Sequence, residues 1–261
     1  MEKYNEKVQK ALRMVKEEPW WIRNIDVQTE EICLEAVRRN GSLLEHVKEQ
    51  TETICLEAVR NRGIAFMYVK EQTHEICLEA LRNNGLMLHY VKEQTTELCD
   101  IAVEKCPTAL QYVKKEFQTY EMCLSAVTRN GHCLEFVYEQ THELCMEAIK
   151  QLSWAIQYVK QQTFDLCLEA VKNNVYALKY VEEQFVDDVC KQLDILYLPS
   201  NEYSRPLFIK KINDEYNCFI GCQKELTVEE LVWCIHNTNG GLEKKPYRQI
   251  YLDFLKENGL I

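Results

Sequence analysis

The chain has 261 residues, of which 46% are apolar, and a net charge of −10 at pH 7. This length can bury a core in one large domain or two smaller ones, and only 8 glycines and 5 prolines argue against a collagen-like or disordered chain. No apolar stretch approaches the roughly 20 residues of a membrane-spanning helix. The negative charge argues against general binding to nucleic acid. We therefore expect a folded protein with neither a membrane nor a nucleic acid as its partner.

The first residues, MEKYNEKVQKALRMVKEEP, are too charged for a secretory signal peptide, so we expect a cytoplasmic protein. The 13 cysteines would suggest a disulfide scaffold in a short secreted chain. In the reducing compartment that we expect here, they predict free thiols.

An internal repeat dominates the sequence. Cysteines recur every 22 residues at positions 33, 55, 77 and 99, and again at 123, 145 and 167, within segments such as ICLEAVRRNG and ICLEALRNNG. Extending the frame backwards places Ala11 at the cysteine position, and two residues, Glu116 and Phe117, interrupt the period. The pattern predicts about eight full units and a degenerate ninth around VDDVCKQL.

Each unit reads as two short helices. A threonine such as Thr51 precedes an acidic turn, which is typical of a helix N-cap. Pairs such as Asn40–Gly41 are expected to end the first helix, with glycine in the left-handed conformation. Helices this short are marginal alone, so each must bury its apolar face against the neighbouring unit. The prediction is a mainly α protein, with an α-solenoid of eight to nine 22-residue helical hairpins over residues 1–195.

The first repeat has diverged and carries Trp20 and Trp21 where later units have smaller residues. We interpret the pair as a cap over the open end of the solenoid, with a binding patch as the alternative.

Residues 196–261 lack the repeat and predict a small α+β module. After a linker, LYLPSNEYSRP, two β-like segments, PLFIKKI and NCFIGCQK, predict a hairpin. Thr227 and Glu230 form a predicted capping box for the helix VEELVWCIHN. A last helix, YRQIYLDFLKEN, is expected to end at Gly259.

The consensus ICLEAVxxNGxxLxYVKEQT resembles a repeat of unknown function that is abundant in giant DNA viruses of amoebae, the mimivirus relatives, and occurs in some bacterial proteins. The residues that carry the resemblance are Cys77–Ala80, Asn84–Gly85 and Tyr90–Lys92. The tail GCQKELTVEELVWCIHNTNGG is also similar to segments that accompany such repeats. The resemblance implies a helical-repeat protein in the cytoplasm of an infected cell. It implies no settled activity and therefore no catalytic residues.

The repeated cysteines favour core packing over chemistry. Equivalent positions in stacked units should lie roughly 8–10 Å apart, too far for a shared metal ion or a disulfide. The other arrangement considered is a zinc set of Cys218, Cys222, Cys234 and His236, although Cys218 and Cys222 share a strand face that suits an ordinary hairpin core. The expectation is no metal and no cofactor.

Two rows recur in the second half of each unit. An aromatic row could line a groove for a partner or pack between units, and a lysine row could be a solvated face or an electrostatic strip. The partner-binding candidates are Tyr68, Tyr90, Tyr112, Tyr158, Tyr180, Lys48, Lys70 and Lys92.

Sequence signatures of common enzymes are absent: there is no GxxxxGKS/T, GxGxxG, HExxH or GxSxG motif. The leading hypothesis is a non-enzymatic protein–protein interaction scaffold that uses an extended repeat surface. One alternative is an adaptor in which the C-terminal module recruits the partner while the repeats act as a spacer. Another is a zinc-binding or enzymatic module at residues 196–261.

Overall fold

The computed structural model describes residues 2–200, 202, 204–212, 215–220, 225–237 and 247–261. It forms two compact units, Met1–Glu147 and Ala148–Ile261. The predicted domains 1–195 and 196–261 were defined by the repeat pattern, and the division into compact units does not test them.

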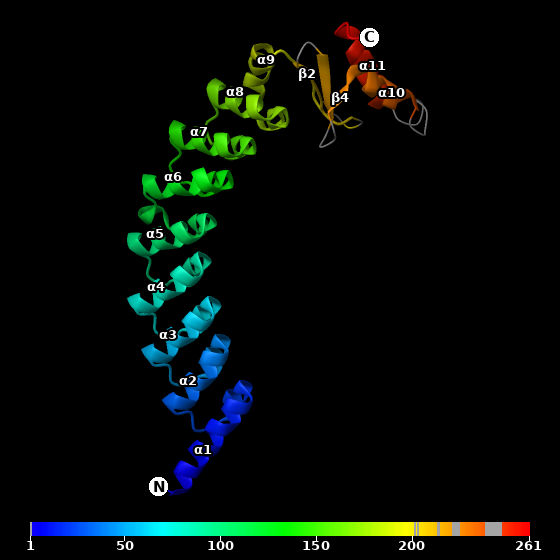
Figure 1. Ribbon diagram of the computed structural model, residues 1–261. Helices are drawn as coiled ribbons and strands as arrows, with labels where there is room; N and C mark the ends of the chain where they lie inside the picture. Colours follow the sequence, from blue (N-terminus) through cyan, green and yellow to red (C-terminus); the bar gives the residue numbers. More distant parts are fainter. Residues whose placement is uncertain (1, 201, 203, 213–214, 221–224, 238–246) are drawn as a thin grey trace. The chain divides into compact units, whose positions relative to one another are not determined.

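The first unit consists of tandem repeats, each an α-helix followed by a 3₁₀-helix (η) (Figure 1). The predicted hairpin repeats are therefore confirmed, and the second helix of each hairpin is a 3₁₀-helix. The elements are α1 (Glu2–Glu17), η1 (Pro19–Asn24), α2 (Glu30–Arg39), η2 (Gly41–His46), α3 (Glu52–Asn61), η3 (Gly63–Tyr68), α4 (His74–Asn83), η4 (Gly85–Tyr90), α5 (Thr96–Lys105), η5 (Pro107–Tyr112), η6 (Lys115–Phe117), α6 (Tyr120–Arg129), η7 (Gly131–Phe136) and the start of α7 (His142–Gln151).

Most of the predicted threonine caps are present. Thr51 has an extended backbone, and its side chain accepts a hydrogen bond from the Ile54 N–H at 3.4 Å, which satisfies one of the free donors of α3. Asparagine caps the second helix in the same way, because Asn40 Oδ1 accepts from the Ser42 N–H at 3.2 Å. A threonine caps α2 to α6 in this way, and an asparagine caps η2, η4 and η7, whereas η3 and η5 begin without a side-chain cap. Thr163, before the helix Phe164–Asn173, makes no cap hydrogen bond, so the cap predicted there is absent.

The glycine at the start of the 3₁₀-helix has a different role from the one expected. Among the described glycines only Gly259 has a positive φ, so the predicted left-handed helix stop at Gly41 is wrong. A Cβ atom on Gly41 would lie 2.2 Å from the Ala58 carbonyl oxygen of the next repeat, and one on Gly85 would lie 2.3 Å from the Ala102 oxygen. Glycine is needed here because successive repeats approach closely.

The step between repeats five and six is built differently. The inserted residues Glu116 and Phe117 belong to an extra 3₁₀ turn, η6, and Pro107 replaces the glycine. In a regular step, Asn61 Nδ2 donates to the Arg38 carbonyl of the preceding helix at 2.8 Å. At the modified step, the longer Arg129 side chain donates to the carbonyls of Val103 and Glu104 at 3.2 and 2.7 Å.

The repeat core follows the predicted apolar face. In α2, Ile32, Cys33, Ala36 and Val37 are all at most 2% exposed. Burial raises the pKa of the thiols, to about 11 for Cys33, so at neutral pH they are protonated. These cysteines act as small apolar residues in the core.

The buried face of the first repeat includes Val15 and Ile22, which are both fully buried. Trp20 and Trp21 are 50% and 43% exposed, and the Trp20 ring lies 6.4 Å from that of His46 in the next repeat. The interpretation of the tryptophan pair as a cap over the open end stays a prediction, with a binding patch as the alternative.

The second unit continues the repeats and ends in a sheet. Its remaining elements are the end of α7, η8 (Ser153–Tyr158), α8 (Phe164–Asn173), η9 (Val175–Tyr180), α9 (Glu183–Gln192), β1 (Ile195–Leu198), β2 (Leu207–Ile212), β3 (Glu215–Ile220), β4 (Leu226–Thr227), α10 (Val228–Asn237) and α11 (Tyr247–Glu257). The strands form an antiparallel sheet in the order β1-β2-β3-β4. The predicted hairpin is β2–β3, but the segment predicted as a linker begins with strand β1.

Both faces of the sheet are covered within this unit. On one face, Ile209 and Cys218 pack with α10 and α11. On the other, Tyr197 stacks on Phe208 with ring centroids 5.1 Å apart, and Tyr176 of η9 contacts Phe208 edge-on at 5.6 Å. The module is thus packed against the last full repeat.

Two predicted helix ends are confirmed in the module. The Thr227 N–H donates to Glu230 Oε2 at 2.9 Å and the Glu230 N–H to Thr227 Oγ1 at 3.1 Å, which is a complete capping box. At the end of α11, Gly259 has φ +67°, and the N–H of Leu260 donates to the Leu255 carbonyl at 3.0 Å. This helix stop turns Leu260 back onto the core.

We predict that Cys77→Ser lowers the free energy of unfolding by about 1–3 kcal/mol, because it places a hydroxyl at a buried apolar position. Cys77→Ala should cost less. In Cys55→Ser the hydroxyl would find an acceptor, Gln50 Oε1, which lies 3.7 Å from the Cys55 sulfur, so this variant is the matched control. Urea unfolding followed by circular dichroism measures all three, and wild-type stability for both Cys77 variants would contradict buried packing.

Candidate partner-binding surface

A glutamine that the sequence reasoning missed joins successive repeats. The amide nitrogen of Gln50 donates to the carbonyls of Leu44 and Tyr68, at 3.2 and 3.0 Å. Its amide oxygen accepts from the Lys70 N–H at 3.0 Å and from the Cys55 thiol at 3.7 Å. One side chain thus satisfies backbone groups of two repeats at once.

The same bridge recurs along both units. The sequence signal was the unchanged glutamine of the KEQT segment, whose role depends on contacts 18 and 20 residues further along the chain. Glutamines that accept from a backbone N–H 20 residues ahead are Gln28, Gln50, Gln72, Gln94, Gln118 and Gln162.

The predicted lysine row is also used between repeats. Lys48 Nζ donates to the carbonyls of Ile25 and Asp26, at 3.4 and 3.3 Å. Lys70 Nζ reaches the Lys48 carbonyl at 2.7 Å, and Lys92 Nζ reaches that of Lys70 at 2.8 Å. All three lysines remain exposed, so their charge still faces solvent. They hold the stack together and also form a positive row along it.

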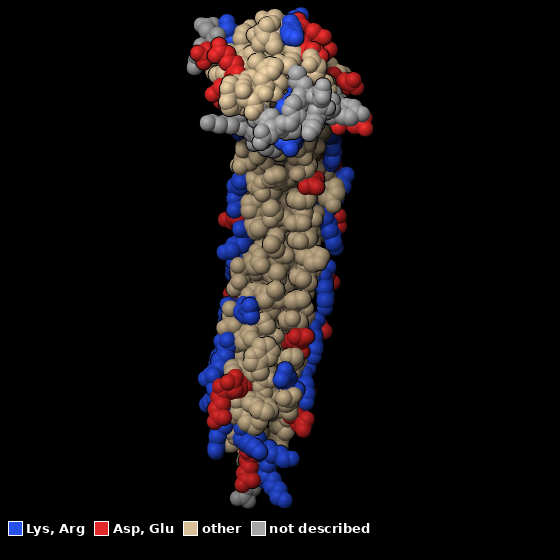
Figure 2. Space-filling view, turned by 90° about the vertical axis from the view of Figure 1, so that its right-hand side faces the viewer, with Lys and Arg blue, Asp and Glu red and all other residues tan. Residues whose placement is uncertain are grey.

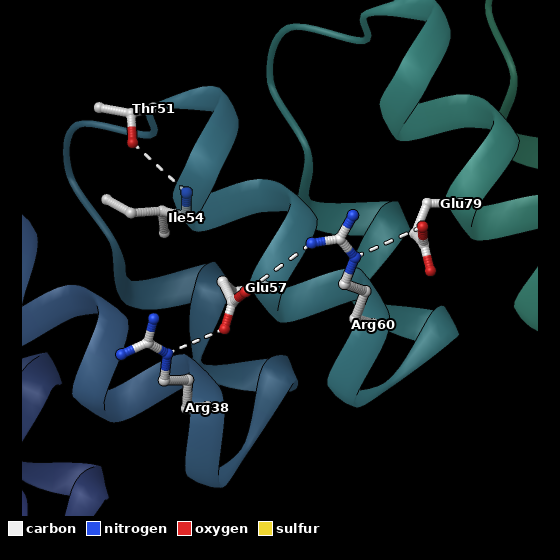
Figure 3. Close-up of polar contacts among 6 residues, drawn as sticks. All are labelled: Arg38, Thr51, Ile54, Glu57, Arg60 and Glu79. Atoms are coloured by element: carbon white, nitrogen blue, oxygen red, sulfur yellow. Dashed lines mark hydrogen bonds and ion pairs between the residues drawn. The ribbon is translucent and has the colours of Figure 1, made fainter.

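A ladder of ion pairs runs along the α-helices (Figure 3). Arg38 Nε lies 2.8 Å from Glu57 Oε2 of the next helix, and Arg60 Nε lies 3.4 Å from Glu79 Oε2 of the one after. These partly exposed pairs contribute little stability individually, but they fix which charges face the neighbouring repeat.

The predicted tyrosine row lies on the 3₁₀-helices. In the first unit, Tyr90 is 38% exposed, while Tyr68 and Tyr112 are half-buried. The His89 ring lies 4.9 Å from that of Tyr90 and 4.8 Å from that of Tyr112. Within the described residues, the hydroxyls of Tyr68, Tyr90 and Tyr112 make no hydrogen bond. The rings therefore pack, and their hydroxyls are free to meet solvent or a partner.

In the second unit the row continues with Tyr158 and Tyr180, both half-buried. Lys179 Nζ lies 4.5 Å from the ring centroids of both Trp154 and Tyr180, a cation–π arrangement.

Three consecutive 3₁₀-helices of the first unit present an uncharged outer surface, which we call the central patch. Ile64, Met67 and Tyr90 are among its most exposed apolar members, at 48%, 41% and 38%. Figure 2 shows a face of the repeats with few charged residues along its middle, and with lysines and arginines interspersed with acidic residues along both edges. The patch consists of Ile64, Met67, Tyr68, Leu86, His89, Tyr90, Thr108, Gln111 and Tyr112.

The structure describes three of the four residues of the predicted zinc set. Cys218 is fully buried in the sheet, Cys234 is half-buried on α10 and His236 is exposed, whereas Cys222 lies outside the described residues. Among the residues that the structure does describe, no three potential ligands gather around a common point. The zinc set stays an untested alternative to the expectation of no metal.

We predict that Gln50→Ala lowers the free energy of unfolding by about 1–3 kcal/mol, because it leaves inter-repeat backbone groups without their partners. The matched control is Gln111→Ala, which removes an exposed amide bonded only within its own helix, at 2.9 Å to the Thr108 carbonyl. Chemical denaturation checks both. Equal stabilities would show that the glutamine bridge does not hold the repeats together.

We predict that combining Tyr68→Phe, Tyr90→Phe and Tyr112→Phe changes the free energy of unfolding by less than about 0.5 kcal/mol, since these hydroxyls have no hydrogen-bond partner in the described structure. The same denaturation curves measure this variant. A loss of about 1 kcal/mol per hydroxyl would instead reveal buried partners.

No helix of the described residues is long and apolar enough to cross a membrane. A comparison with curated proteins and one with solved structures gave no match. A family model described as a domain of unknown function, DUF4116, matches four overlapping or adjoining segments, residues 29–72, 73–118, 95–140 and 141–186. Together the matches span residues 29–186, more than half of the chain. The protein therefore belongs to the DUF4116 family of helical-repeat proteins.

Proposed function

We propose that this protein is a non-enzymatic interaction scaffold, and that a partner protein lies along the 3₁₀ side of its repeats. The observation that carries the proposal is the central patch, in which three successive repeats expose apolar and aromatic side chains with no charged residue among them. Exposed apolar side chains that adjoin one another are typical of protein–protein contact sites. A solenoid also provides a long surface at little structural cost, because each unit needs only its neighbours.

The charges beside the patch favour one kind of partner. The exposed lysines at positions 48, 70 and 92 form one basic row, in which an exposed glutamate follows each lysine, and Arg62 and Arg82 are exposed at helix ends. We propose a partner segment whose apolar side chains cover the patch and whose carboxylates meet these basic residues.

Two further parts of the proposal concern the cell and the compartment in which the protein acts. The resemblance to repeats of giant DNA viruses motivates a role in the cytoplasm of an infected cell. The cysteines of the repeats are free thiols placed in the core, which supports a reducing compartment.

We predict that Met67→Glu combined with Tyr90→Glu abolishes partner capture while leaving the fold intact, because both side chains are exposed and a carboxylate would be buried unpaired on binding. The measurement is quantitative affinity capture from cells that produce the protein, followed by mass spectrometry, with circular dichroism as the test of folding.

The matched control is Thr53→Glu combined with Thr96→Glu. It adds the same two charges at exposed positions in the first turns of α3 and α5, where helices tolerate acidic residues. Proteins captured by wild type and control but lost with the patch variant support the proposal. Capture that survives the patch variant unchanged would refute it.

The adaptor alternative predicts the opposite dependence. If residues 196–261 recruit the partner, capture persists in the patch variant and is lost when a surface residue of that module, such as Trp233, is changed.

A further inference from the structure

An open apolar slot lies in the C-terminal module and shares no residue with the central patch. It has a volume of about 750 Å³, within the range of peptide and ligand sites. Its walls are formed by Tyr216 of β3, Val232 and Trp233 of α10, and Leu260. Trp233 is 63% exposed, the highest exposure of any large apolar residue described. Most of the apolar surface of this indole therefore faces the slot and solvent.

The walls of the slot are positioned by the two confirmed helix termini, the start of α10 and the end of α11. The capping box of Thr227 and Glu230 fixes where α10 leaves the sheet, and the turn at Gly259 brings Leu260 back beside Trp233. The walls are therefore positioned by backbone geometry and exist before any partner arrives.

One edge of the slot is an incomplete strand edge. β4 pairs with β3 only through Asn217–Thr227 and Cys218–Leu226, and α10 begins immediately after Thr227. Within the described residues, the first two residues of β3, Glu215 and Tyr216, have no strand neighbour on that side. Since successive residues of a strand point their N–H and C=O groups to opposite sides, one of these two offers both groups to an incoming strand.

The charge around the slot is acidic. Its lining includes the exposed carboxylates of Glu215 and Glu229 and contains no lysine or arginine among the described residues. Lys211 lies opposite Tyr216 on β2 and is not part of the lining. This pattern is the reverse of the basic edges beside the central patch.

From these observations we infer that the slot binds an extended, basic segment of a partner protein. The segment pairs with the free edge of β3, inserts one large apolar side chain against Trp233, and places lysine or arginine next to Glu215 and Glu229. This binding is independent of the proposed contact along the repeats, so the chain would join two partners of opposite charge.

The test uses the full chain and a fluorescein-labelled heptapeptide of alternating lysine and isoleucine with a central phenylalanine, followed by fluorescence anisotropy. We expect saturable binding that weakens about tenfold or more in Trp233→Ala, as for loss of a central aromatic anchor. Glu215→Gln combined with Glu229→Gln should weaken binding severalfold at low salt, and less at high salt. Methylating the backbone nitrogens on one edge of the peptide should also weaken it.

The controls separate this slot from general attraction to an acidic protein. Trp20→Ala removes another exposed indole, 50% accessible, from the first repeat and should leave the affinity unchanged. The same peptide with glutamate in place of lysine should not bind. Melting curves test whether the Trp233→Ala variant folds. We expect it to fold, because the side chain that it removes is exposed.

Absence of binding up to millimolar peptide, or equal affinity for wild type and Trp233→Ala, would overturn the inference. So would self-association of the wild type, measured by sedimentation, that Trp233→Ala removes, since a second copy would then be the occupant. Neither result bears on capture through Met67 and Tyr90, so the two proposals fail separately.

Discussion

The structure depends on one recurring interaction, the side-chain amide of a glutamine that binds backbone groups of two successive repeats. Gln50 donates to the Leu44 and Tyr68 carbonyls and accepts from the Lys70 N–H, and the pattern returns 22 residues later. The 3₁₀-helix is only six residues long, so its end has backbone groups that the helix itself cannot satisfy. The glutamine supplies those partners and at the same time fixes the register of the stack.

This constraint divides the surface into fixed and variable positions. Glutamine, lysine and threonine positions are bound to neighbouring repeats, and glycine is required where Ala58 or Ala102 approaches. The outward positions of the 3₁₀-helices are less constrained, although Ser42 Oγ accepts a hydrogen bond from Arg62 Nη1 of the next repeat at 3.4 Å. Ser42, Ile64, Leu86 and Thr108 occupy the same position in four successive repeats, yet differ in size and polarity. Variation concentrates where it does not disturb the stack, which is why a repeat surface of this kind can be adapted to a partner.

Sequence reasoning succeeded where the cause is local and failed where it is distant. The threonine caps and the Thr227–Glu230 box depend on residues within one turn and were predicted, although Thr163 makes no cap hydrogen bond. The 22-residue period was read directly from the recurrence of residues in the sequence. The 3₁₀ character of the second helix was not specified, because one apolar turn fits either helix type. The reason for Gly41 lies in a carbonyl 17 residues away, and that of Gln50 in backbone groups 18 and 20 residues away. Of the candidate site, the sequence predicted the tyrosine and lysine rows, but not that the tyrosines of the first unit belong to a wider uncharged patch.

The end of the repeat array explains why the last unit contains a sheet. A solenoid must cover the apolar face of its final repeat, and here α9 has no 3₁₀ partner after it. Tyr176 packs edge-on against Phe208 and Phe219, so one face of the sheet takes the place of a further repeat. The other face packs against α10 and α11, which carry the slot around Trp233. Because the last repeat and the helices α10 and α11 pack on opposite faces of the sheet, the module can cover the end of the repeats without covering its own slot. The proposed scaffold surface and the proposed second binding site can therefore coexist in one chain.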